Sequence, residues 1–71
     1  MQKRSLSLHG HRTSLALEPE FWDEIDKAVT ESGLSFAAFI TQLDDQRITE
    51  RARQNLASYL RVWVVKRLQS S

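Results

Sequence analysis

The sequence predicts a small, mostly helical domain with one short β-strand near its N-terminus and three helices after it. Three observations predict this class. Polar and apolar residues alternate over residues 12–17, which is the period of a half-buried strand. Later segments place apolar residues at helical spacing. Pro19 and Gly33 fall where these segments begin and end.

The composition bounds the class of protein. The 71 residues contain no cysteine, and 41% of them are hydrophobic. A chain of this length forms one domain that buries only about 60% of its unfolded surface. The lack of cysteine excludes disulfides, thiolate metal sites and cysteine nucleophiles. No apolar run approaches the roughly 20 residues that span a bilayer, and no signal peptide follows the basic start, so we expect a cytoplasmic protein without membrane contact.

The net charge of +1 hides a segregation of charge along the chain. Residues 1–17 carry three Lys or Arg and no acid, and residues 51–71 carry five and no acid. Residues 18–32 carry six acids and one Lys. Such asymmetry says more about partners than the total does. The total therefore combines two basic ends with an acidic middle.

The strand is predicted to have one leucine face and one polar face, because side chains alternate along a strand. The leucine face consists of Thr13, Leu15 and Leu17, and the polar face consists of Arg12, Ser14 and Ala16. Leu6 and Leu8 repeat the alternation before Gly10. Residues 1–10 are therefore either a basic N-terminal arm or an extra strand, and the sequence leaves both open.

Residues 19–32 are predicted as the first helix. Pro19 is favoured at the first helical position, the acids near it suit the helix dipole, and Gly33 is a good C-terminal cap. Ser35 can cap a second helix over residues 36–46. A third helix is predicted over residues 55–68, with Asn55 or Thr49 as its cap.

A lone strand leaves backbone N–H and C=O groups unpaired, so the predicted strand must pair with another one. Two copies of the chain can form an antiparallel two-stranded ribbon over a shared helical core. We therefore predict an intertwined homodimer with an intersubunit antiparallel β-ribbon. The predicted dimer core consists of Leu15, Leu17, Trp22, Ile25, Phe36, Phe39, Ile40 and Leu43.

The order of strand, Pro, helix, Gly turn and helix resembles the ribbon-helix-helix family of DNA-binding proteins. The resemblance covers residues 11–46, from Arg12 through Pro19, Phe21-Trp22 and Gly33-Leu34-Ser35. The run His9-Gly10-His11-Arg12-Thr13-Ser14, with Phe21-Trp22 and Asn55-Leu56-Ala57-Ser58, is similar to a bacterial subgroup of that family. Residues 47–71 then form an additional C-terminal helix and tail.

The resemblance implies a small transcription regulator that binds double-stranded DNA as a homodimer, with its ribbon in the major groove. It implies base contacts from Arg12, Ser14 and Ala16. It also implies contacts to the DNA backbone from the start of the second helix, and we expect Lys3 and Arg4 of the basic arm to add phosphate contacts. The residues at that helix start are Ser35, Phe36 and Ala37.

An alternative function is a dimeric interaction module, antitoxin-like or an adaptor, whose third helix binds a protein and whose DNA binding is weak or absent. Enzymes are disfavoured because there is no glycine-rich phosphate loop and no nucleophile beside a base at motif spacing. His9 and His11 lie two residues apart, but no nearby acid or cysteine completes a metal site. We therefore expect no metal and no cofactor.

Overall fold

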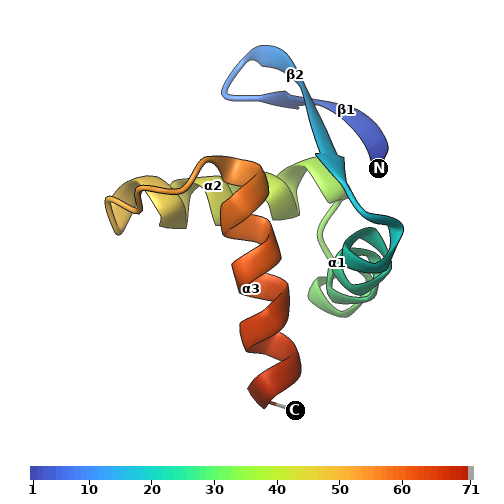
Figure 1. The fold of residues 1–71 in the computed structure, drawn as a ribbon. Helices are drawn as coiled ribbons and strands as arrows, with labels where there is room; N and C mark the ends of the chain where they lie inside the picture. Colours follow the sequence, from blue (N-terminus) through green and yellow to red (C-terminus); the bar gives the residue numbers. More distant parts are fainter. Residues whose placement is uncertain (71) are drawn as a thin grey trace.

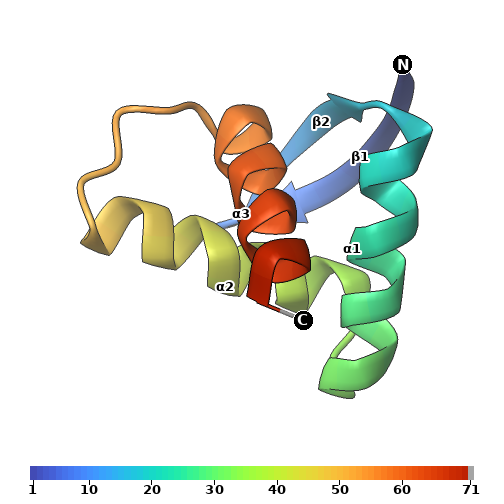
Figure 2. The same cartoon turned by 60° about the horizontal axis from the view of Figure 1, so that its bottom comes forward.

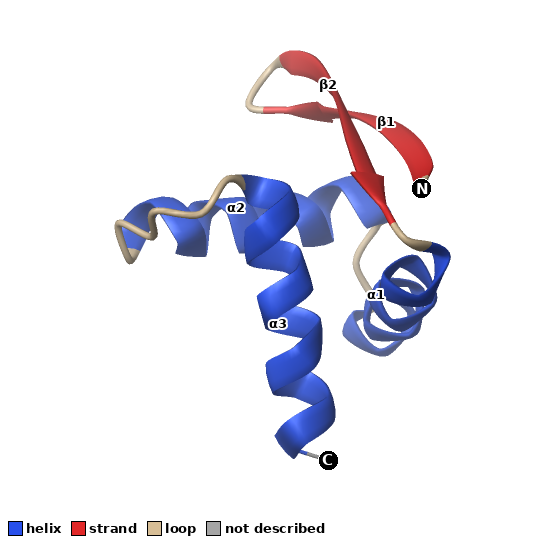
Figure 3. Ribbon diagram, viewed as in Figure 1, coloured by secondary structure: helices blue, strands red, loops and turns tan. Residues whose placement is uncertain are grey.

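The chain folds as a β-hairpin followed by three helices (Figure 1). This computed structural model describes residues 1–70, and residue 71, the last of the predicted C-terminal tail, lies outside the described residues. The strands are β1 (Gln2–Leu8) and β2 (His11–Leu17), and the helices are α1 (Pro19–Ser32), α2 (Phe36–Thr49) and α3 (Leu56–Ser70). Figure 3 shows both strands at one end of the molecule, with α3 extending away from them.

The two strands pair antiparallel through a two-residue turn. Leu8 pairs with His11, and the intervening His9 and Gly10 have φ of 50° and 82°, as a type I′ turn requires. Residues 2–8 are thus a strand, which was one of the two alternatives for the N-terminal segment. The sequence predicts that β2 pairs with a second copy of the chain. In the structure one edge of β2 pairs with β1, which the short turn brings directly alongside it, and pairing with a second copy stays a prediction.

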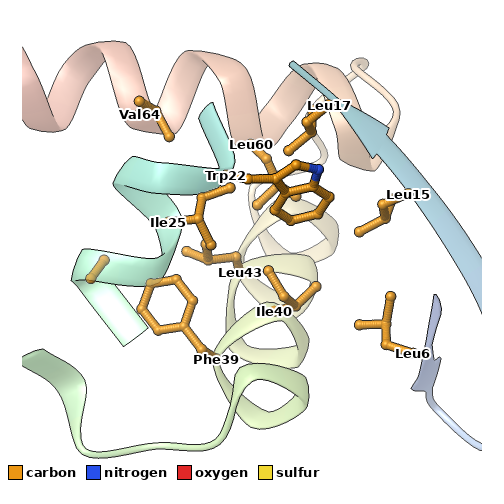
Figure 4. Close-up of a cluster of buried hydrophobic side chains, with 11 residues drawn as sticks. Leu6, Leu15, Leu17, Trp22, Ile25, Phe39, Ile40, Leu43, Leu60 and Val64 are labelled. Atoms are coloured by element: carbon orange, nitrogen blue, oxygen red, sulfur yellow. The ribbon is translucent and has the colours of Figure 1, made fainter. Parts of the chain in front are cut away.

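One hydrophobic core lies between the hairpin and the three helices (Figure 4). Trp22 of α1 is fully buried, and its indole N–H donates to the carbonyl oxygen of Gln2 at 2.9 Å, which connects α1 to β1. The buried apolar residues come from every element and are Leu6, Leu15, Leu17, Trp22, Ile25, Ala28, Phe39, Ile40, Leu43, Leu60 and Val64. Because Leu60 and Val64 lie on α3, this helix completes the core instead of being appended to it.

Local sequence signals set the ends of the first two helices. α1 begins at Pro19 and ends before Gly33, whose φ is 73°, so the predicted bounds are confirmed. The Ser35 hydroxyl accepts a hydrogen bond from the Ala38 N–H at 3.1 Å and caps α2, as predicted. α2 continues to Thr49, past the predicted end at residue 46.

Asn55 is the residue that caps α3. Its side-chain oxygen accepts a hydrogen bond from the Ser58 N–H at 2.9 Å, which settles the choice between the two candidate caps. Further along the helix, the ring of Trp63 packs edge-on against the ring of Phe39, with centroids 5.5 Å apart. This aromatic contact connects α3 to α2.

Two ion pairs join the basic C-terminal segment to the acidic segment around α1. Arg61 of α3 pairs with Glu18 at 3.0 Å, and Arg67 pairs with Glu31 at the end of α1. Figure 2 shows α1 and α3 ending on the same side of the molecule, where the second pair forms. The hydrogen bond from Arg61 lowers the pKa of the Glu18 carboxyl. The basic C-terminal segment therefore partly neutralises the acidic helix.

Candidate nucleic-acid interface

One face of the hairpin is buried and the other is exposed. Leu6, Leu15 and Leu17 are at most 7% exposed, and they pack on the helices. The opposite face, called the ribbon face below, consists of Lys3, Ser5 and Ser7 from β1 and Arg12, Ser14 and Ala16 from β2. Ala16 is half-buried and the other five residues are exposed. Two strands of the same chain thus contribute to this surface.

The three residues predicted to contact bases lie together on the ribbon face. In the register of the hairpin, Arg12 lies opposite Ser7, Ser14 opposite Ser5, and Ala16 opposite Lys3. None of the ion pairs within residues 1–70 involves Arg12, so its guanidinium is available to a ligand. Base contact by these residues stays a prediction.

Lys3 and Arg4, both predicted to contact the DNA backbone, point to opposite sides of β1. Lys3 lies on the ribbon face, whereas Arg4 lies on the inner face and donates to both oxygens of Asp26, at 2.7 and 2.9 Å. The Arg4 guanidinium also lies 4.6 Å from the centre of the Trp22 ring. The hydrogen bonds raise the pKa of Arg4 and lower the pKa of Asp26. Arg4 therefore connects β1 to α1 and is directed away from the ribbon face.

The start of α2 lies next to Arg4. The guanidinium of Arg4 lies 5.4 Å from the Phe36 ring, and that ring is 5.8 Å from the ring of Trp22. The first-turn N–H groups form the positive end of this helix. The backbone contacts predicted for Ser35, Phe36 and Ala37 therefore fall at a helix N-terminus, and they stay predictions.

The residues predicted for a dimer core lie in the core of one chain. Seven of the eight are buried, and Phe36 packs against them while partly buried. Leu6 from β1, and Leu60 and Val64 from α3, complete this core. The second copy was expected because the predicted strand had no partner and the core was small. Within the chain, β1 is the partner strand and α3 adds apolar side chains to the core. Assembly of two copies stays a prediction.

Sequence reasoning missed a buried carboxylate at Asp44, whose side chain is 7% exposed. The guanidinium of Arg47 donates to it at 2.9 Å, and Nε2 of His9 lies 3.1 Å from its other oxygen. The same His9 nitrogen is 3.3 Å from Asp45. The spacing of Asp44 and Arg47 was a sequence signal for their helical pair. The contact with His9 joins residues 35 apart in the chain, and it fixes the turn of the hairpin onto α2.

Sequence reasoning also left Ser5 and Ser7 without a role. The alternation of these serines with Leu6 and Leu8 is the signal that places them opposite the buried face. The same alternation places Arg4 on the buried side with Leu6, so its position was predictable.

Among residues 1–70, no group of three His, Cys, Asp or Glu side chains could hold a metal ion. Within the same residues, no helix has the length and apolar character needed to cross a membrane. On α3, Val62, Val65 and Leu68 are 38%, 44% and 52% exposed, and they are called the α3 stripe below. This stripe is a second candidate surface for a partner.

A family model described as a ribbon-helix-helix domain matches residues 1–68 of the chain. The match includes β1 and nearly all of α3, so it extends beyond the resemblance that covers residues 11–46. No curated protein and no solved structure gives a significant match. The hairpin and the three helices are thus matched as one unit.

Proposed function

The chain belongs to the ribbon-helix-helix family, and on that premise we propose that it binds double-stranded DNA as a small transcription regulator in the bacterial cytoplasm. Domains of this family commonly bind DNA or act as antitoxins or regulators, and they are generally not enzymes. The proposed function needs no cofactor.

The main observation behind the proposal is the ribbon face. It presents the two cations Lys3 and Arg12 with serine hydroxyls between them, and within residues 1–70 neither cation is in an ion pair. Paired strands lie about 4.8 Å apart, and the major groove is about 12 Å wide. The hairpin therefore has a width and a charge that suit insertion into this groove.

The base contacts in this proposal come from the polar face of β2. Arg12 pairs with O6 and N7 of guanine through two parallel hydrogen bonds. The Ser14 hydroxyl can donate to or accept from a base edge, and the Ala16 methyl group contacts the methyl group of thymine. Arg12 supplies most of the discrimination, because it is the one long polar side chain of β2 on this face.

The phosphate contacts come from two places. Lys3 of β1 pairs with a phosphate beside the groove, and the N–H groups of Ser35, Phe36 and Ala37 bind another at the start of α2. Arg4 has no part in this proposal, because its guanidinium already donates two hydrogen bonds to Asp26. Such contacts contribute affinity and register without choosing the sequence.

We also propose that two copies bind together, since members of the family typically dimerise. A symmetric dimer would contact a palindromic site, with one half for each copy. Because each chain buries its own core, we expect a contact between copies that is smaller than an intertwined core. Sedimentation of the protein with and without a duplex measures this, and one chain per duplex at every concentration would contradict the dimer.

The experiment that tests DNA binding begins with selection of bound sequences from a random duplex pool. We expect Arg12→Ala to weaken binding to the selected duplex about 5- to 150-fold and to relax the preference at one position. Arg53→Ala removes the same charge from the exposed loop between α2 and α3, so it serves as the matched control. Equal binding of all duplexes by wild type and Arg12→Ala would refute the proposed contact.

A second function is favoured by the α3 stripe. Exposed apolar residues on one element suit docking of a protein, as in an antitoxin-like or adaptor subunit. Salt dependence separates the two functions, because binding through phosphates strengthens steeply as salt falls. Absence of binding to any duplex at low salt would favour the protein partner.

A further inference from the structure

A cavity lies where the end of α2, the start of α3 and the loop between them meet. It has a volume of about 220 Å³ and is called the α2–α3 pocket below. The residues that line it include Gln46, Glu50, Tyr59, Val62, Trp63 and Lys66. None of these residues belongs to the ribbon face. We propose that the α2–α3 pocket binds a small aromatic carboxylate, which is a function separate from DNA binding by the hairpin.

One side of α3 forms the longest wall of the pocket. Helical spacing of i, i+3, i+4 and i+7 places on this side the residues Tyr59, Val62, Trp63 and Lys66. At 1.5 Å per residue, the seven steps from Tyr59 to Lys66 correspond to about 10 Å along the helix axis. The polar groups of these two residues therefore start from opposite ends of the wall, with apolar side chains between them.

The middle of this wall presents an indole ring that the core holds in place. Trp63 is half-buried, and its ring packs edge-on against the ring of Phe39, with centroids 5.5 Å apart. Val62 lies beside Trp63 and is 38% exposed. Aromatic rings attract one another in offset or edge-on arrangements. A ligand with a flat apolar body is therefore the kind that this part of the pocket suits.

A hydrogen-bond acceptor lies at the Tyr59 end of the wall. The Tyr59 hydroxyl donates to Oε2 of Glu50 at 3.1 Å. Burial and this hydrogen bond raise the pKa of Tyr59 above its ordinary value, so the hydroxyl stays protonated and continues to donate. Within residues 1–70 no hydrogen bond involves Oε1, the other carboxylate oxygen of Glu50. This oxygen is therefore open to a donor group on a ligand.

A cation lies at the other end of the wall. The side chain of Lys66 is exposed, and none of the ion pairs in the described part of the chain involves it. Its ammonium group can donate to a ligand carboxylate, and hydrogen bonds between charged groups are stronger than neutral ones. The two ends of the pocket thus favour a ligand with a carboxylate at one end and a donor at the other.

Hydrogen bonds hold the loop that closes the pocket. The N–H of Ala52 donates to the carbonyl oxygen of Arg47 at 3.0 Å. The guanidinium of Arg47 in turn donates to the carbonyl oxygen of Gln54 at 3.3 Å. Figure 2 shows this loop leaving the end of α2 and returning to the start of α3. The pocket is therefore formed before a ligand arrives, which lowers the entropy cost of binding.

The size of the pocket limits the ligand to a single ring. Sites for drug-sized molecules have volumes of about 300–1,000 Å³, and this pocket is smaller. A suitable probe is 4-hydroxybenzoate, whose carboxylate can accept from Lys66 and whose hydroxyl can donate to Glu50. Its ring then lies against Trp63. For a probe with about ten non-hydrogen atoms we expect a Kd of about 0.1–1 mM.

An NMR titration of the labelled full chain with 4-hydroxybenzoate tests the proposal. We expect saturable shifts at the indole N–H of Trp63 and at the amides of Glu50, Val62 and Lys66. Two related probes each lack one contact. The uncharged 4-hydroxybenzamide should bind about 5- to 10-fold more weakly, and benzoate, which has no hydroxyl, about 2- to 5-fold more weakly.

A matched pair of lysine variants identifies the cation. Lys66→Gln should weaken binding of 4-hydroxybenzoate about 5- to 10-fold, and folding should be kept because the side chain is exposed. Lys27→Gln removes the same charge from α1 and should bind like wild type. Equal Kd values for the three probes, an unchanged Kd in Lys66→Gln, or no saturable shift at these residues would overturn the proposal. The titration contains no DNA, so its result leaves the proposed function untouched.

Discussion

Shortening the side chain of Leu6 tests whether β1 is a structural strand or a flexible arm. Leu6 is 4% exposed, and Figure 4 shows it directed toward Ile40 and Leu15 in the core. If β1 is docked as the structure has it, Leu6→Ala removes buried methyl groups and leaves a space that its neighbours only partly fill. If residues 1–10 were an arm, the same change would have almost no effect on stability.

The magnitude follows from the burial of Leu6. Leucine-to-alanine changes at buried positions cost about 2–5 kcal/mol of unfolding free energy. Leu6 lies in a two-stranded sheet at the margin of the core, where relaxation is easier, so we expect about 2–3 kcal/mol. A chain of this size has only about 3–5 kcal/mol in total, so Leu6→Ala brings it close to unfolding. Leu6→Val removes one methylene and should cost about 1 kcal/mol, or about 4–8 °C in Tm.

The assay is urea unfolding followed by tryptophan fluorescence, since Trp22 is fully buried in the folded chain. Ser7→Ala is the matched control on the same strand, and its exposed side chain should leave stability within about 0.5 kcal/mol of wild type. Leu6→Ala and Leu6→Val variants that are as stable as wild type would refute the docking of β1.

Three further predictions concern the turn, an ion pair and a cap. Gly10→Ala should cost about 1–2 kcal/mol of unfolding free energy in the same assay, because Gly10 has a left-handed φ of 82°. An added Cβ would meet no atom within 4 Å, so the cost comes from the backbone conformation and not from a clash. An unchanged free energy of unfolding would contradict the turn. Arg4 lowers the pKa of Asp26 below its ordinary value of 3.8, so the folded state gains stability above that value and loses it as pH falls through the lowered pKa. Urea midpoints at pH 7 and pH 3 should therefore differ less in Asp26→Asn than in wild type, and an equal difference would argue against the pair. Ser35→Ala removes the hydroxyl that accepts from Ala38 and should lower stability by about 1 kcal/mol, measured by thermal unfolding; an unchanged Tm would exclude the cap.

Elements with strong local signals were predictable from the sequence. Pro19 and Gly33 set the bounds of α1, because one favours the first helical position and the other adopts the left-handed conformation after the last. The orientation of Arg12 on the exposed face followed from the period of the strand. In each case the deciding interaction lies within a few residues of the chain.

The partner of a strand is not encoded in its own alternation. The pattern around Leu15 predicts a strand that must pair. It does not indicate whether the neighbouring strand belongs to the same chain or to another copy. The turn at His9 and Gly10 gives β2 a partner strand in its own chain, and the contact of this turn with Asp44 is visible only in the fold. The residues predicted for a dimer core cluster within one chain, and their contact with a second copy stays a prediction.

The charges were informative only once their partners were known. Arg4 was assigned to the DNA backbone because it is basic and follows Lys3. In the structure the two residues diverge, and Asp26 binds Arg4. Acids of α1 are likewise paired with cations of the same chain, Glu24 with Lys27 and Glu31 with Arg67. The cations that suit a nucleic acid are those left unpaired on the ribbon face.

The most direct test of the proposed function is an NMR titration of the isotopically labelled full chain with the duplex obtained by selection. We expect the largest amide shifts on the ribbon face, at Lys3, Ser5, Ser7, Arg12 and Ser14, with smaller shifts at the start of α2. The α3 stripe should stay unchanged. Shifts concentrated on Val62, Val65 and Leu68, with the ribbon face unaffected, would contradict DNA binding by the hairpin.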